Sequence, residues 1–130
     1  MKKLFLLALV IGLIFLIKID QSFQPENFEE LQERARSVNS NVPKQFTTDG
    51  CSLFPNCLLG ENLTEICIEH DLKYWAGGSE EERRQADLVL RDAVNEKIKF
   101  LGDVMYWKSR IGGHSLIPSP WRWGYGHGYW

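Results

Sequence analysis

The residues best suited to chemistry lie in one short stretch, where His70 and Asp71 are followed by Tyr74. Residues four apart share a face of an α-helix, so His70 and Tyr74 point the same way. Asp71 is turned by about 100° from His70. A histidine whose ring is held by a second polar group has the parts of a general base. The plainer alternative is a core histidine that an aspartate satisfies.

A helix must carry this stretch, and its ends can be read from the sequence. Asn62 followed three residues later by Glu65 matches a capping box, which predicts a start near Asn62. Gly77 and Gly78 predict the end, because glycine accepts the left-handed backbone that terminates helices.

A second helix is expected directly after these glycines. Ser79 and Glu82 form a further capping-box pattern, and Gly102 predicts an end near Leu101. An apolar stripe at helical spacing indicates the core-facing side; it consists of Leu90, Val94, Ile98 and Leu101. A shorter helix is expected from about Val104.

Two antiparallel helices joined by a short turn pair residues that lie equally far from the turn. His70 lies about eight residues before the turn and Asp87 about nine after it, so these two should face each other. Asp92 would lie roughly 7 Å further along. Four polar side chains gathered on one hairpin favour a functional site, because each buried polar group costs roughly 1 to 3 kcal/mol if unpaired.

The chain has 130 residues and a formal net charge of −2, which suits one domain and gives no basic field for nucleic acid. Lys2 and Lys3 precede an apolar run over residues 4–17, as in export signals. We assign residues 1–19 to a signal peptide or membrane anchor and favour the anchor, because no small-x-small cleavage site follows. The chain is then exported, either anchored on the outer face of the inner membrane or secreted or periplasmic.

Residues 20–47 are expected to form an amphipathic helix and a linker, with Pro25 at the first helical position and Phe28, Leu31 and Ala35 on one face. Residues 48–130 then form the main domain. The fold class predicted for this domain is all-α.

Export implies an oxidising compartment, so the three cysteines indicate one disulfide and one free thiol. The spacing alone does not choose the pair among Cys51, Cys57 and Cys67. A structural zinc site made of these cysteines and His70 is a competing interpretation.

The stretch Cys67-Ile68-Glu69-His70-Asp71 resembles the C-x-x-H-D signature of secreted phospholipases A2. The likeness runs from about Gly50 to Asp92, including Tyr74 four residues after the histidine and a cysteine sixteen residues before Cys67. Segments 48–52 and 120–126 look like a bacterial branch of uncharacterised phospholipase A2-like proteins.

This resemblance implies specific roles. His70 would activate a water that attacks the sn-2 ester of a membrane phospholipid, with Asp87 and Tyr74 orienting its ring. Ca²⁺ would be the cofactor, bound by the Asp71 carboxylate and by backbone carbonyls. These implied carbonyls belong to Gly50, Ser52 and Phe54, and the implied disulfide joins Cys51 to Cys67.

The sequence also departs from that family. A second family disulfide is absent, because its two positions hold Ile66 and Ala93; we expect an apolar contact in its place. The loop after Gly50 is less glycine-rich than usual, with Leu53 and Phe54 where small residues often stand.

The last ten residues are rich in aromatic rings and glycine. Amphipathic rings favour the membrane interface, which predicts membrane contact for Trp121, Trp123, Tyr125 and Trp130. The alternatives are rings packed back over the hairpin, and a non-enzymatic membrane-surface or partner-binding protein that keeps the hairpin for its shape.

Overall fold

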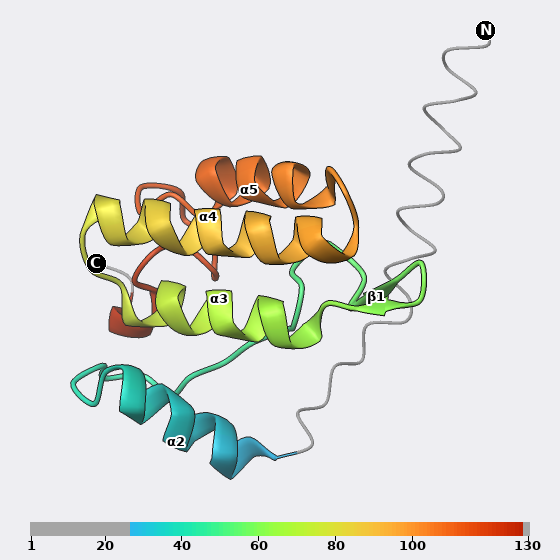
Figure 1. Cartoon of the computed structure of the whole chain (residues 1–130). Helices are drawn as coiled ribbons and strands as arrows, with labels where there is room; N and C mark the ends of the chain where they lie inside the picture. Colours follow the sequence, from blue (N-terminus) through green and yellow to red (C-terminus); the bar gives the residue numbers. More distant parts are fainter. Residues whose placement is uncertain (1–26, 129–130) are drawn as a thin grey trace, which may run out of the picture.

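The computed structural model describes residues 27–128, and these fold into a mostly helical domain (Figure 1). The helices are α2 (Phe28–Val38), α3 (Thr64–Ala76), α4 (Glu80–Lys97) and α5 (Leu101–Gly112), with a 3₁₀ helix at Tyr125–His127. The described residues are mostly helical with one two-stranded sheet, so the expected all-α class is confirmed in this coarse sense. The predicted signal or anchor at residues 1–19 lies outside the described residues.

The four helices lie side by side, with α4 between α3 and α5, and α2 against the other side of α3 (Figure 1). One core cluster joins α2 to α3 and contains Leu31, Ala35, Phe46, Ile68, Leu72, Trp75 and Ala76. A second joins the Cys51 loop to α3, α4 and α5 and contains Cys51, Leu63, Cys67, Leu90, Val94 and Met105. The site helices α3 and α4 are thus fixed from both sides.

The start of α3 differs from the prediction. Leu63 is the N-cap residue and makes no side-chain cap, so the expected capping box of Asn62 and Glu65 does not form. Asn62 belongs instead to a two-stranded antiparallel sheet, β1 (Cys57–Leu58) with β2 (Glu61–Asn62), and its Oδ1 accepts a hydrogen bond from the Thr64 amide. The sheet was not predicted, because two-residue strands leave no periodic pattern.

The hairpin turn is confirmed at both of its ends. α3 ends at Ala76, and its C-cap residue Gly77 has a φ of 70°, the left-handed value that glycine permits. α4 begins with the Ser79 and Glu82 capping box.

The end of α4 comes earlier than expected. Phe100 takes a left-handed φ of 66° and starts α5 at Leu101, so Gly102 lies inside α5 and does not end α4. A Cβ on Gly102 would lie 2.0 Å from the Arg91 carbonyl oxygen. This glycine permits close packing of α5 on α4, which explains why it misled the prediction. The helix α2 begins at Phe28 behind an Asn27 cap, and Pro25, the expected first helical position, lies outside the described residues.

Cys51 and Cys67 form a disulfide, and Cys57 is free and exposed. The pairing implied by the resemblance is therefore confirmed. It ties the loop after Gly50 to α3. Two of the three sulfurs needed for the zinc alternative are used in this bond, and residues 27–128 contain no cluster of three metal-ligating side chains.

Candidate active site

The predicted meeting of α3 and α4 side chains is confirmed. His70 Nε2 lies 2.8 Å from Asp87 Oδ1, and the Tyr74 hydroxyl donates to the same oxygen at 2.7 Å. Asp87 is fully buried and the His70 side chain is 10 % exposed. Asp92 is exposed and pairs with Arg91, so it takes no part in this network.

The contact with Asp87 fixes the tautomer of His70. A carboxylate accepts and cannot donate, so His70 Nε2 carries the hydrogen and Nδ1 keeps a free lone pair. Burial lowers the pKa of His70, against the opposing effect of the Asp87 charge. The ring is therefore neutral near pH 7, as a general base must be.

Asp87 has a partner that the sequence did not reveal. Arg110, on α5, donates to Asp87 Oδ2 at 2.9 Å. Burial acts to raise the pKa of Asp87, but the hydrogen bonds from His70, Tyr74 and Arg110 outweigh it and hold that pKa below its usual value. Arg110 was missed because the sequence predicts a helix from about Val104 but not how that helix packs on α4; the helix begins earlier, at Leu101.

Asp71 lies beside the loop that precedes α3, and it lines a small pocket together with His70 and Tyr74. Its Oδ2 accepts a hydrogen bond from the Thr48 hydroxyl at 2.6 Å, and that hydroxyl in turn accepts from the Gly50 amide at 3.0 Å. Burial raises the pKa of Asp71 to about 7, and the nearby Asp49 charge adds to the effect. Thr48 and Asp49 are thus part of the loop site that the sequence prediction missed.

The oxygen donors in this region suit calcium, which prefers carboxylate and carbonyl oxygens. Asp71 supplies a carboxylate whose raised pKa indicates that its charge is incompletely compensated. The Ser52 carbonyl already accepts a hydrogen bond from Lys108 Nζ at 2.6 Å. The implied roles of the Gly50 and Phe54 carbonyls stay predictions.

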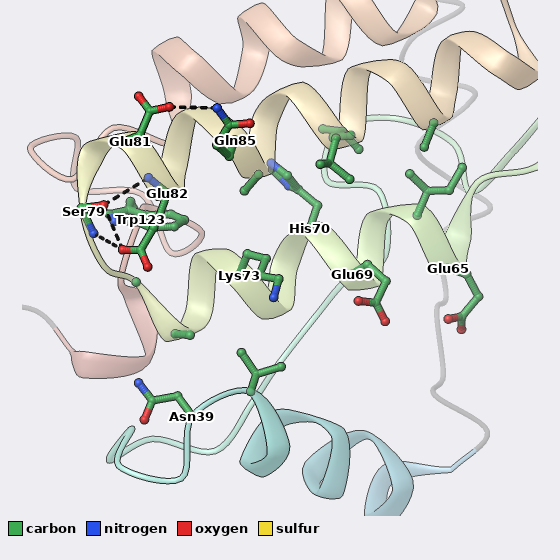
Figure 2. Close-up of a pocket in the computed structure, with 18 residues that line it drawn as sticks. Asn39, Glu65, Glu69, His70, Lys73, Ser79, Glu81, Glu82, Gln85 and Trp123 are labelled. Carbon is green, nitrogen blue, oxygen red and sulfur yellow. Dashed lines mark hydrogen bonds between the residues drawn. The ribbon is translucent and has the colours of Figure 1, made fainter.

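A cavity of about 770 Å³ lies along α3 and α4 and has His70 in its wall (Figure 2). Its apolar lining includes Ile66, Ala86, Val89, Leu90 and Ala93. Ile66 and Ala93, where the resembled family carries a disulfide, thus line one cavity. The expected apolar contact between them stays a prediction.

Charged side chains also line this cavity. Glu65 and Glu69 point from α3 toward the side where α2 lies (Figure 2), and Arg34 of α2 binds both. On α4, Glu82 is held by the Ser79 cap and Glu81 by Arg84. These carboxylates have local partners and leave the apolar wall as the distinctive feature of the cavity.

The aromatic tail packs back onto the hairpin. Trp123 is buried, meets Tyr74 edge to face at 5.0 Å between ring centroids, and donates from Nε1 to the Gly78 carbonyl at 2.9 Å. The Tyr125 hydroxyl donates to the Thr47 carbonyl. Trp123 is therefore not free for the membrane contact expected from the sequence, because its ring is buried against Tyr74 and the hairpin turn.

Of the other tail residues, Trp121 is partly exposed and borders a small pocket that His70 and Asp71 also line. Trp130 lies outside the described residues. No helix within residues 27–128 is long and apolar enough to cross a membrane.

Comparisons of the chain with protein-family models, curated proteins and solved structures returned no match in any of the three.

Proposed function

We propose that this chain hydrolyses the sn-2 ester of phospholipids at a membrane surface in a calcium-dependent reaction, as its resemblance to secreted phospholipases A2 implies. The observation that carries the proposal is the His70 and Asp87 contact of 2.8 Å in the wall of a 770 Å³ cavity. A base held in one tautomer beside an apolar cavity suits a substrate with long acyl chains.

The proposed reaction assigns each proton and bond to a group. His70 Nδ1 takes a proton from water while the water oxygen attacks the ester carbonyl carbon. The carbon–oxygen bond to the glycerol then breaks, and the imidazolium returns its proton to the leaving alkoxide. Asp87 and Tyr74 keep the ring oriented throughout. Calcium bound at Asp71 would polarise the ester carbonyl and stabilise the oxyanion.

The test is hydrolysis of phosphatidylcholine vesicles by the full-length chain, with calcium present or removed by a chelator. We expect release of fatty acid and lysophospholipid with calcium, and loss of that release with chelator. Vesicles left intact under both conditions would contradict the proposed activity, and hydrolysis that a chelator does not affect would contradict the proposed cofactor.

A second prediction concerns the cavity. Ala93→Trp should place an indole in the cavity and lower hydrolysis of long-chain phospholipids about tenfold or more, because specificity follows the fit of the acyl chain. A short-chain, water-soluble ester should be affected much less. The matched control is Glu96→Trp, an exposed position on the same helix that does not line the cavity. Equal losses for both esters would show that the cavity does not hold the acyl chain.

A non-enzymatic role at a membrane surface is the second candidate, and one observation favours it. Large apolar side chains are exposed on α5, at Val104, Trp107 and Ile111, and at Phe100 just before it. Vesicle binding without hydrolysis in the test above would support this role. An exported or membrane-anchored location remains part of both proposals and rests on the apolar run at residues 4–17.

A further inference from the structure

Lys108 is a partly buried lysine that the proposed reaction does not use. It lies on α5, and its Nζ donates to the Ser52 carbonyl at 2.6 Å. The same Nζ lies 5.4 Å from the ring centroid of Phe54. Lys108 therefore contacts two of the three loop residues whose carbonyls the resemblance assigns to calcium.

Its surroundings are those expected around a bound cation. The small pocket that Lys108 lines is also lined by Ser52, His70 and Asp71. Burial lowers the pKa of Lys108, and the charges of Asp71, Asp49 and Asp87 oppose that shift. A charge that has lost part of its hydration needs such compensation. The loop carbonyl and these carboxylates supply it.

We propose that the Lys108 ammonium is a tethered cation that occupies part of the loop site and competes with calcium for the Ser52 carbonyl. The inference rests on the proposed function for the presence of calcium at this loop. It goes beyond that function by giving a residue on α5 control over the affinity of the metal. Calcium can reach the Ser52 oxygen only when the ammonium moves away, since two cations repel at this distance.

A merely structural role for Lys108 makes the opposite prediction. If the lysine supported the loop without occupying the site, its removal would loosen the loop and weaken calcium binding. If it competes, its removal frees an oxygen ligand and leaves Asp71 and Asp49 with more uncompensated charge. Ligand charge tunes calcium affinity over orders of magnitude. Removal of Lys108 should therefore raise calcium affinity if the lysine competes with the metal and lower it if the lysine only supports the loop.

The experiment measures binding of calcium alone to the full-length chain, by calorimetry and by the calcium-dependent rise in Tm. Lys108→Met keeps the stem of the side chain and removes the charge. Lys108→Gln removes the charge but keeps a donor that can bond the carbonyl. Lys99→Met, at an exposed position just before α5, is the matched control.

We expect Lys108→Met to bind calcium about tenfold or more tightly than the unmodified chain, Lys108→Gln to lie between them, and Lys99→Met to leave the affinity unchanged. Equal or weaker binding by Lys108→Met overturns the inference, as does an absence of calcium binding in all four proteins. If Lys108→Met does not fold, calcium binding by Lys108→Gln decides the question. Tighter binding than in the unmodified chain supports the competition, and equal or weaker binding contradicts it. No lipid is present, so a failed hydrolysis assay and a failed competition remain separate results.

Discussion

His70→Gln should lower phospholipid hydrolysis by about 10² to 10⁴-fold, the range that a positioned general base supplies. The glutamine amide can still donate to Asp87 Oδ1, so the buried carboxylate keeps a partner and the fold should persist. Glutamine cannot take a proton from water at neutral pH. The measurement is the initial rate on vesicles at saturating calcium, with melting curves to confirm folding.

The control is His114→Gln, because His114 lies beyond α5 and outside both pockets. Its rate should match that of the unmodified chain.

Asp71→Asn should give a different defect from His70→Gln. It should weaken calcium binding and hydrolysis together, whereas His70→Gln should leave calcium affinity nearly intact. Wild-type turnover by the His70→Gln variant would rule out the proposed base.

Asp87→Ala should destabilise the fold by about 3 kcal/mol, near the lower end of the range for breaking a buried charge pair. The change leaves His70, Tyr74 and Arg110 without their common acceptor. Arg110 is partly exposed and can turn toward water, which limits the cost. Chemical denaturation at pH 7 gives the free energy of unfolding directly.

Asp92→Ala is the control on the same helix, and an exposed change of this kind should stay within about 0.5 kcal/mol. The pH dependence gives a second check. Because the folded pKa of Asp87 lies below its ordinary value of 3.8, the stabilisation is present above that value and is lost as pH falls through the folded pKa. The difference in the free energy of unfolding between the unmodified chain and Asp87→Ala should therefore become smaller in strong acid. If Asp87→Ala lowers that free energy no more than Asp92→Ala does, a central role for Asp87 is contradicted.

The part of the site that could be predicted from the sequence is the part set by local spacing. His70 and Tyr74 lie one helical turn apart, and the Ser79 capping box fixes the start of the helix that carries Asp87. These two facts place the three side chains together. The Cys51 and Cys67 pairing followed from the resemblance, since three cysteines alone allow three pairings.

Arg110 and Lys108 could not be predicted in the same way. Both reach the site from α5, whose direction depends on the left-handed Phe100 and on the close approach of Gly102 to Arg91. A glycine at a helix crossing and a glycine at a helix end look alike in sequence. Tertiary packing decides between them.

The inward packing of the tail has a consequence for how far the chain can be shortened. A Cβ on Gly77 would lie 3.0 Å from the Cα of Gly124. Gly124 of the tail therefore packs directly against Gly77 in the hairpin turn. Trp123 lies behind Tyr74 at the same place, and Arg110 reaches Asp87 from α5. The motif-bearing hairpin is thus not an autonomous unit. A fragment meant to hold His70 and Asp87 in register therefore needs α5 and the glycine-rich tail, and it also needs α2, whose core cluster packs on α3.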